Sequence, residues 1–302
     1  MAMGAYLPDP EVSKVTTAGE AATFAYAACA MQGWRESMED FCVLDLELAP
    51  GVACLGVLDG HGGQQVAAFA AGYLARSIVG KWGGEVETVL RDSFLAVDEA
   101  LRTEEVQRQL ASSLGDGTAG DVIASEQGCA ALLSLLIGSD LYLANAGDCR
   151  CVMGVSGQAV QLTTDHKPSL PLERTRILAA GSAVLDGRVN DILDLSRGLG
   201  DLAFKGNSSL PAEAQAITAL PDVLKVPITP SADFLVMATD GVWDVLTSEA
   251  CVDYVYREMA GRELKEVAEG LLGTCLASDP NNLGGLGCDN MACVLVRFSR
   301  ST

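Results

Sequence analysis

The chain has 302 residues, of which 49% are hydrophobic, and a mean hydropathy of +0.25, so it can bury a large core and is not intrinsically disordered. Its 40 acidic and 20 basic residues give a formal charge of -20. This balance argues against nucleic-acid binding, because no basic stripe is available for phosphate contacts, and it fits either cation binding or simple solubility.

The ten cysteines predict buried thiols rather than disulfides or a zinc site. None has the Cys-x-x-Cys spacing, most lie in apolar runs, and the chain has only two histidines. The first twenty residues are polar and lack a secretory signal pattern. The longest apolar region, 128–147, is divided by Asp140 into two strand-length halves, so no transmembrane helix is expected. These features favour an intracellular location, cytoplasmic or nuclear.

Residues 1–20 are expected to form a loosely structured N-terminal arm. If Met3 is the native start, Gly4 becomes a candidate N-myristoylation site that would anchor the chain to a membrane. Against this, Pro8 stands where that motif has Ser or Thr.

The first half of the remaining chain alternates between strand and helix patterns. Short apolar segments that end in turn residues predict strands at 22–30, 41–48, 53–58, 129–137, 141–144 and 151–155. Apolar residues at three-four spacing predict two amphipathic helices over 66–78 and 86–101. The segment 111–127 is rich in Gly, Ser and Asp and is expected to be a loop.

The second half begins with an irregular segment at about 165–215, in which 174–180 is expected to be helical. A long irregular segment inside a compact domain is more often functional than accidental, so we expect a flap-like insertion. The regular elements that follow are a strand at 233–238, helices near 252–259 and 264–275, a loop at 278–288 and a strand at 291–298.

This order of elements predicts an α+β fold in four layers, an α-β-β-α sandwich. Successive short strands favour antiparallel pairing, and two antiparallel sheets packed face to face would each need helices on the outer face. Residues 21–302 would form this single domain. A monomer is expected, because no apolar stripe is left without a partner.

Acidic residues recur where the predicted strands meet loops. They are Glu39, Asp40, Asp59, Asp148, Asp240 and Asp289. Gathered in one cleft they would raise one another's pKa and require cations, and all-oxygen ligands select Mg²⁺ or Mn²⁺. Two such ions about 3.5 to 4 Å apart can lower the pKa of a shared water and direct it at a phosphate ester. Taken singly, each carboxylate could instead cap a strand end or lie in a solvated turn.

Seven motifs occur in a fixed order: MQGWRESMED, VLDGHGG, ANAGDCR, DHKP, LSRGLGD, ATDGVWDVL and CDN. With them the chain resembles the metal-dependent serine/threonine protein phosphatases of the protein phosphatase 2C family (PP2C, PPM) from Met31 to Phe298. The resemblance implies a β-sandwich flanked by helices, with two metal ions in a cleft at one end. It also implies hydrolysis of phosphoserine and phosphothreonine in phosphoproteins by a metal-bridging hydroxide, without a phosphoenzyme intermediate.

The same resemblance assigns the ligands of the first ion. Asp59 would bridge both metals, and the carbonyl group of Gly60 would bind one of them. Asp240 and Asp289 would complete the protein ligands of the first ion, with Asn290 supporting the site.

The second ion would be served by Glu39, with Asp40 acting through water. A weaker third ion would use Asp148 and Asp240, with Asp244 nearby. Asp148 could instead be a simple turn residue after Gly147.

Two basic side chains have catalytic counterparts in the family. Arg35 matches the phosphate-binding arginine, because a guanidinium can hold two phosphate oxygens, although it could instead be an exposed partner of Glu39. His61 matches the proposed general acid that protonates the leaving oxygen, and its alternative is a structural histidine. His166 is expected to organise the irregular segment, which resembles the family's flap beside the cleft.

The chain also departs from the family pattern. Cys129 and Ala130 stand where small hydroxyl residues are usual, and Ser182 replaces a glycine. These positions are expected to lie away from the ligands and to alter packing and rate only. A phosphatase-like module that binds phosphoproteins without turnover is the alternative function, and an acidic structural metal binder would leave Arg35 and His61 unexplained.

Overall fold

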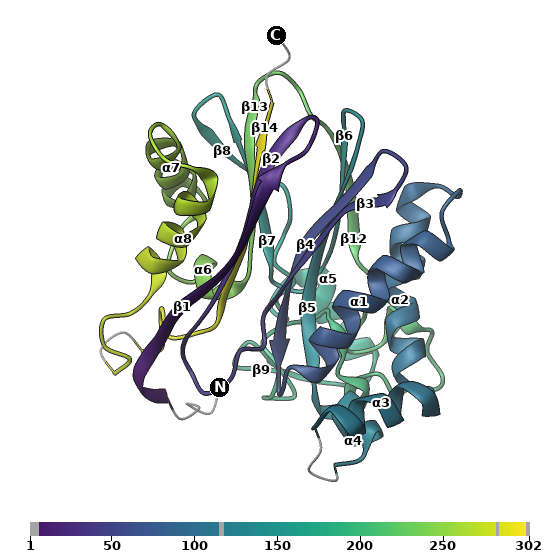
Figure 1. The fold of residues 1–302 in the computed structure, drawn as a ribbon. Helices are drawn as coiled ribbons and strands as arrows, with labels where there is room; N and C mark the ends of the chain where they lie inside the picture. Colours follow the sequence, from purple (N-terminus) through teal and green to yellow (C-terminus); the bar gives the residue numbers. More distant parts are fainter. Residues whose placement is uncertain (1–5, 115–117, 282–283, 300–302) are drawn as a thin grey trace.

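The computed structural model describes residues 6–114, 118–281 and 284–299. Two large antiparallel sheets pack face to face, and helices cover the outer face of each (Figure 1). The predicted four-layer α+β sandwich is therefore confirmed. No helix in the described ranges is both long and apolar enough to cross a membrane.

The first sheet has six strands. In spatial order they are β1 (Tyr6–Glu20), β2 (Phe24–Arg35), β14 (Met291–Phe298), β13 (Ala232–Ala238), β7 (Arg150–Val155) and β8 (Gln158–Gln161). Its outer face is covered by α6 (Asp240–Trp243), α7 (Ser248–Met259) and α8 (Leu264–Cys275).

The second sheet is formed by β12 (Asp222–Pro227), β6 (Asp140–Ala146), β5 (Gly128–Ile137), β4 (Val52–His61) and β3 (Phe41–Ala49), with the short β11 (Leu199–Gly200) paired to β5. Four helices lie on its outer side: α1 (Gln65–Gly80), α2 (Val86–Leu101), α3 (Glu104–Leu114) and α4 (Gly120–Glu126).

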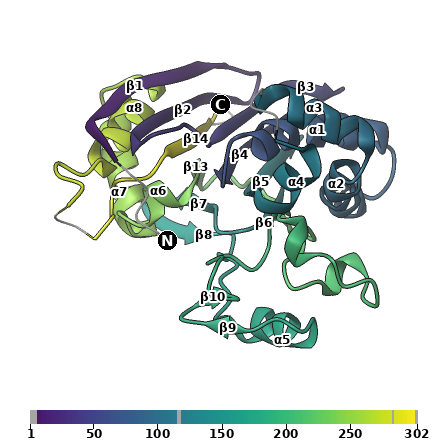
Figure 2. The same cartoon turned by 90° about the horizontal axis from the view of Figure 1, so that it is seen from below.

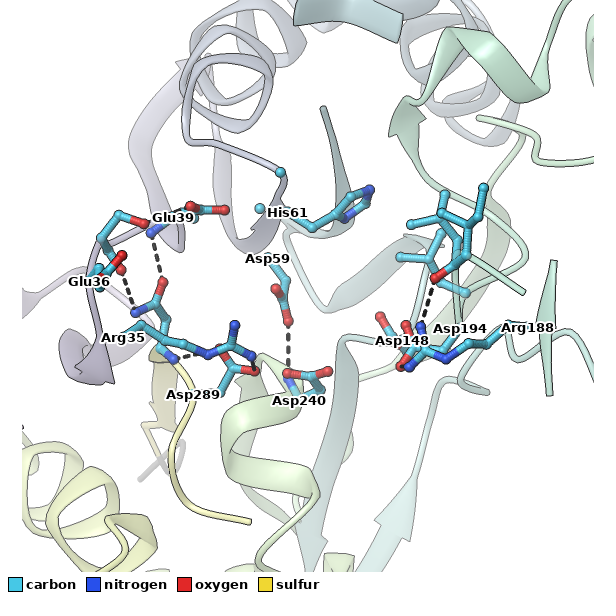
Figure 3. A pocket seen from close by; sticks show the side chains of 17 residues that line it. Arg35, Glu36, Glu39, Asp59, His61, Asp148, Arg188, Asp194, Asp240 and Asp289 are labelled. Carbon is cyan, nitrogen blue, oxygen red and sulfur yellow. Dashed lines mark hydrogen bonds and ion pairs between the residues drawn. The ribbon is translucent and has the colours of Figure 1, made fainter. Parts of the chain in front are cut away.

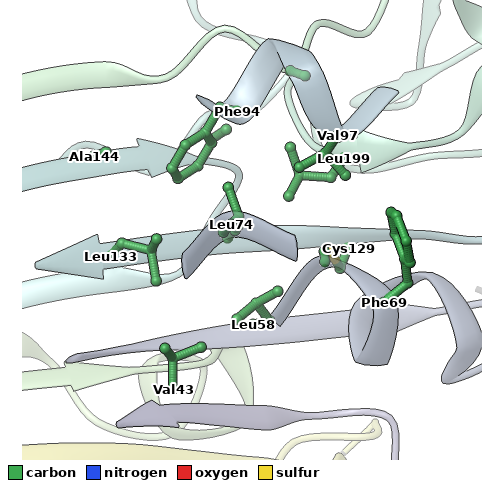
Figure 4. Packing of buried hydrophobic residues seen from close by; sticks show 14 of the residues in the cluster. Val43, Leu58, Phe69, Leu74, Phe94, Val97, Cys129, Leu133, Ala144 and Leu199 are labelled. Atoms are coloured by element: carbon green, nitrogen blue, oxygen red, sulfur yellow. The ribbon is translucent and has the colours of Figure 1, made fainter. Parts of the chain in front are cut away.

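Helix packing follows the predicted apolar stripes. On α1 the buried stripe includes Phe69 and Leu74, which pack with Phe94 of α2 over Leu58 and Leu133 of the sheet (Figure 4). Burying each such side chain contributes about 1.5 to 3 kcal/mol of transfer free energy. A second cluster fills the space between the sheets, and a third lies under α7 and α8. Apolar packing on both outer faces and between the sheets thus fixes the positions of the strand ends.

The expectation of a loosely structured arm is wrong for residues 6–20, which form β1 and pair with β2. This edge strand is held by backbone hydrogen bonds along one side, so its sequence needs little apolar alternation, and Val15 is 78% exposed. Pro8 and Pro10 are tolerated at such an edge. Gly4, the candidate acylation site, lies outside the described residues.

The prediction of a loop at 111–127 is also wrong in part, because α3 continues to Leu114 and α4 occupies Gly120–Glu126. Ile123 and Ala124 of α4 are buried against the other helices. The strands β8 and β12 were not predicted, because both are polar edge strands whose stability comes from pairing with β7 and β6.

The flap-like insertion contains α5 (Pro171–Ala179), β9 (Val184–Leu185), β10 (Arg188–Val189) and two short 3₁₀ turns, Leu202–Phe204 and Ala212–Ala214. Seen from below, α5, β9 and β10 lie together beside the sandwich (Figure 2). They share a small apolar cluster of their own around Ile177, Val189 and Ile217. The segment is therefore folded, although its sequence lacks regular periodicity.

Buried charge anchors this insertion to the domain. Glu173 of α5 is buried and accepts hydrogen bonds from Arg176 (2.7 Å), Arg197 (2.7 Å) and Ser196 (2.7 Å). Burial alone would raise its pKa, but the arginines and the hydroxyl outweigh burial and lower the pKa of Glu173 to about 2. Arg197 also pairs with Asp222 of β12 at 2.8 Å, which ties the insertion to the second sheet.

Candidate active site

One end of the sandwich holds a cavity of about 360 Å³ (Figure 3). It lies where β2 and β4 end, where α6 begins and where the chain enters β14. The lining includes nine of the residues expected from the sequence: Arg35, Glu39, Asp59, Gly60, His61, Asp148, Asp240, Asp289 and Asn290. Residues far apart in the chain therefore meet at one place, such as Arg35 and Asp289, which are separated by 254 positions.

Close backbone packing explains the glycine in Asp59-Gly60-His61. A Cβ atom at Gly60 would lie 2.4 Å from the carbonyl oxygen of Glu39, so a larger residue would push β4 away from that segment. Glu39 is fixed in turn, because its backbone N–H donates to Asn290 Oδ1 at 2.8 Å and its carboxylate accepts from the N–H of Gly63 at 3.0 Å. These contacts hold Glu39 and Asp59 at the same cavity.

The carboxylates disfavour one another's ionised forms. Burial is the first cause that raises the pKa of Asp59, and the charges of Asp40, Asp148 and Asp289 add to it. Burial also raises the pKa of Asp240 well above its ordinary 3.8, and the charges of Asp59, Asp148, Asp289 and Asp244 add to it. The backbone N–H of Asp240 donates to Asp59 Oδ2 at 3.3 Å, which brings the two carboxylates together. Positive charge in this cavity would relieve the repulsion.

Asp40 and Asp244 lie beside the cavity lining rather than in it. Asp40 is buried and accepts a 2.8 Å hydrogen bond from Thr239 Oγ1, and burial raises its pKa despite that bond, together with the charges of Asp289 and Asp240. Asp244 follows α6, and partial burial and the charge of Asp148 raise its pKa against the opposing charge of Lys167. Both therefore belong to the same acidic cluster.

Basic side chains already contact two of the expected ligands. Arg35 donates to Asp289 Oδ2 at 2.6 Å, and Lys167 donates to Asp148 Oδ2 at 2.5 Å.

Within the described ranges, no three His, Cys, Asp or Glu side chains are arranged closely enough to hold an ion as they stand. The sequence left open that Arg35 is an exposed ion-pair partner of Glu39, but in the structure its guanidinium pairs with Asp289. Burial lowers and the Asp289 charge raises the Arg35 pKa, and the net direction is upward.

His61 has a partner that the sequence reasoning missed. Both carboxylate oxygens of Asp201 lie near His61 Nε2, at 2.9 and 3.0 Å, and Asp201 is only 2% exposed. Partial burial opposes the imidazolium, but the charge of Asp201 and its hydrogen bond outweigh burial and raise the pKa of His61 above 6.5. The signal was present as the final Asp of LSRGLGD, yet nothing in the sequence places that residue beside His61.

Gly128 makes room for this pair. In the β4–β5 ladder Gly128 stands opposite His61, and a Cβ atom there would lie 2.1 Å from Asp201 Oδ2 and 2.7 Å from His61 Nε2. Asp201 itself has a left-handed backbone with φ of 51°, which is uncommon outside glycine. Its N–H donates to the carbonyl oxygen of Gln127 at 2.9 Å, which fixes this conformation.

The family departures in β5 lie closer to the site than expected. Ala130 stands directly opposite Asp59 and Cys129 opposite Gly60 in the antiparallel ladder. The expectation that they lie away from the ligands is therefore wrong, because opposite residues share one face of a sheet. Ser182 is placed in the insertion, where its hydroxyl group accepts from Asn190 Nδ2 at 3.3 Å.

His166 is buried at the base of the insertion. One ring nitrogen contacts the backbone of Gly147 and the other lies 3.1 Å from Asp222 Oδ2. It therefore joins the turn after β6 to β12, and its carbonyl oxygen accepts from Ser196 Oγ of the irregular segment at 2.9 Å. That His166 organises this segment stays a prediction.

Comparisons with known proteins agree with this geometry. The family model described as protein phosphatase 2C matches residues 24–282. The chain is 39% identical to the probable protein phosphatase 2C 60 of Arabidopsis thaliana, over 99% of this chain and 93% of the relative. It is 40% identical to protein phosphatase 2C homolog 2 of Hypocrea jecorina, over 98% of this chain and 67% of the relative.

Solved structures show the same fold. A crystal structure of a phosphatase from a pathogenic strain of Toxoplasma gondii matches with a TM-score of 0.77 at 24% identity, covering 96% of each chain. The crystal structure of serine-threonine phosphatase 2C from the same organism matches with a TM-score of 0.74 at 20% identity, over 95% of this chain and 99% of the other. The resemblance drawn from the seven motifs is thus confirmed, and the chain belongs to the protein phosphatase 2C family of protein serine/threonine phosphatases.

Proposed function

We propose that this chain hydrolyses phosphoserine and phosphothreonine in phosphoprotein substrates with the help of Mg²⁺ or Mn²⁺. The observation that supports this best is that Asp59 and Asp240, with raised pKa values, line the same cavity as Arg35 and His61. The carboxylates that would bind cations thus line the same cavity as the side chains that would bind the phosphate and donate a proton.

The donor set suits hard divalent cations. The acidic groups that line the cavity offer only oxygen atoms, which favours Mg²⁺ or Mn²⁺ over zinc or copper. Asp59, Asp240, Asp289 and Glu39 would hold two ions, with Asp40 behind them. When bound, the ions supply a water of lowered pKa and positive charge for the phosphate oxygens. Asn290 supports this arrangement, because it receives the N–H of Glu39 and donates to the carbonyl groups of Gln32 and Ser37.

Arg35 would bind the phosphate. Its side chain is 30% exposed, and its guanidinium is held at the cavity by Asp289. Because a guanidinium carries five N–H donors, Arg35 can hold two phosphate oxygens while it stays bonded to Asp289. The phosphate ester would thus be oriented with its leaving oxygen away from Arg35.

His61 would protonate the leaving oxygen of serine or threonine. Nε2 of His61 is bonded to the carboxylate of Asp201, so Nδ1 is the nitrogen that can give a proton to the substrate. Although burial opposes it, the charge of Asp201 raises the pKa of His61 above its ordinary 6.5, which favours the protonated ring that can act as an acid. Asp201 is a positioning residue in this scheme, because it acts through His61. No covalent phosphoenzyme is required.

The test is turnover of p-nitrophenyl phosphate and of a phosphothreonine peptide, with Mn²⁺ and with EDTA. We expect activity only with the metal, and a loss of at least about a hundredfold in Asp59→Asn with the fold intact. Asp253→Asn, on the exposed side of α7, is the matched control and should behave like the wild type. Activity that survives EDTA, or near-normal turnover in Asp59→Asn, would refute the assignment, and peptide binding without turnover would support a binding module instead.

A further inference from the structure

Lys167 lies at the edge of the acidic cluster and contacts one of its members directly. It belongs to the DHKP motif, between β8 and α5, and its ammonium donates to Asp148 Oδ2 at 2.5 Å. The side chain of Asp148 is 5% exposed, whereas that of Lys167 is 37% exposed. A buried carboxylate is thus neutralised by a lysine that reaches it from the solvent side.

The other expected ligands lie close to this contact. Asp148 and Asp240 line the same cavity, and Asp244 follows α6, which begins at Asp240. Asp148, Asp240 and Asp244 are the residues expected to hold the weaker third ion. The ammonium therefore stands beside the place where that ion would bind.

Other basic groups nearby are directed elsewhere. Arg150 donates two hydrogen bonds to Asp165, at 3.0 and 2.6 Å, and its guanidinium lies over the ring of Trp243. Arg188 pairs with Asp194 at 3.2 Å and donates to the carbonyl oxygen of Ile192. Among the described ion pairs of Asp148, Lys167 supplies the positive charge.

Resting on the proposed function, we propose that Lys167 competes with a divalent cation for Asp148 and keeps the third ion weakly bound. Two effects of Lys167 support this competition. The ammonium uses one carboxylate oxygen of Asp148 as a hydrogen-bond acceptor, so an ion can recruit that oxygen only by displacing Lys167. The positive charge also repels an incoming cation across a partly buried space, where charges are screened less than in bulk water. Asp59 and Glu39 have no such competitor among their described contacts.

The test is calorimetric titration of the full chain with Mn²⁺. In Lys167→Met, which keeps the length of the side chain and removes its charge, we expect the third equivalent to bind at least about tenfold more tightly, with the first two unchanged. Lys167→Arg keeps the charge and should bind as the wild type does. Lys225→Met is the matched control, because Lys225 forms an exposed pair with Asp140 at 2.8 Å and should leave all binding unchanged.

The outcomes separate two failures. If the wild type takes up no Mn²⁺, the proposed function fails. If the wild type binds two ions tightly and Lys167→Met leaves the third unchanged or weaker, the competition by Lys167 is refuted. The double variant Lys167→Met/Asp148→Asn must lose the tighter binding of the third equivalent that is expected in Lys167→Met. Lys167→Gln repeats the measurement if the Met variant does not fold, and thermal melting of each variant reports on folding independently of metal affinity.

Discussion

Asp201 presents both of its carboxylate oxygens to a single nitrogen of His61, at 2.9 and 3.0 Å. This relationship fixes which ring nitrogen faces Asp201 and supplies a negative charge that stabilises the imidazolium. It does so from a residue 140 positions away in the chain, between the two-residue strand β11 and the 3₁₀ turn Leu202–Phe204.

Replacement of Asp201 by Asn should therefore remove the charge while it keeps the shape. We expect kcat to fall by about 10 to 10² on phosphothreonine peptides and by less on p-nitrophenyl phosphate, whose leaving group needs little protonation. The pKa of His61 should fall towards its ordinary value, which moves the alkaline limb of the pH profile to lower pH.

A double-mutant cycle gives the control for this prediction. In a His61→Asn background, the further change Asp201→Asn should not alter the ratio of the two substrates. Equal losses on both substrates in the single Asp201→Asn variant would mean that Asp201 has a structural role only.

Gly128→Ala should damage the same pair by steric displacement. The new Cβ atom would lie 2.1 Å from Asp201 Oδ2, so the carboxylate must move away from His61. We expect the same selective loss on phosphopeptides that is predicted for Asp201→Asn, together with lower stability. Gly206→Ala, with no atom within 4 Å of its Cβ, is the control and should leave kinetics and melting temperature unchanged.

Removal of metal should make stability depend on pH in a defined direction. Burial raises the pKa of Asp40, Asp59 and Asp240 above the ordinary 3.8, so the folded chain holds protons that the unfolded chain releases. In EDTA the free energy of unfolding should thus fall as the pH rises above 3.8 through the folded pKa values.

Mn²⁺ binds the ionised carboxylates, so its stabilising effect should grow as the pH rises. Melting temperatures in EDTA and in Mn²⁺, from about pH 5 to about pH 8, measure both trends. A Mn²⁺ effect that is the same at all pH values would contradict the account of the cluster, and Asp59→Asn should flatten the dependence in EDTA.

Glu173→Gln should destabilise the fold by about 3 kcal/mol, because it leaves Arg176 partly buried without its counter-charge and Arg197 with only the exposed Asp222 as its partner. Urea denaturation measures the change. Glu258→Gln, which breaks more exposed pairs with Arg257 and Arg262, is the matched control and should cost less than about 1 kcal/mol.

The pH dependence of the Glu173 contribution has the opposite sign to that of the metal cluster. Its pKa is lowered from 4.5 to about 2, so its stabilising contribution is present above pH 4.5 and is lost as the pH falls towards 2. Wild type and Glu173→Gln should therefore converge in stability in acid. A constant difference between them at all pH values would rule out the ionised form as the source of the contribution.

The sequence predicts much of the fold and of the cavity lining for a physical reason. Apolar periodicity reports burial, and Asp59, Asp240 and Asp289 stand at ends of buried strands that the sandwich brings to one side. Strands such as β1 and β12 lack that signal, because backbone pairing with a neighbour stabilises them rather than burial of their own side chains.

Partners across the cavity are harder to predict. Asp201 reaches His61 only because Gly128 leaves space and the backbone of Asp201 is left-handed. Lys167 reaches Asp148 only because the insertion starts beside the turn after β6. Such pairs depend on three-dimensional register, which a pattern within one segment does not encode.

The insertion between β8 and β12 has an apolar centre of its own, yet it contacts the domain through Arg197 with Asp222, through β11 with β5 and through Asp201 with His61. The histidine at the cavity is therefore oriented by a segment that folds around a separate core. Chimeras that exchange this insertion between relatives should keep turnover only where a carboxylate returns to the place of Asp201.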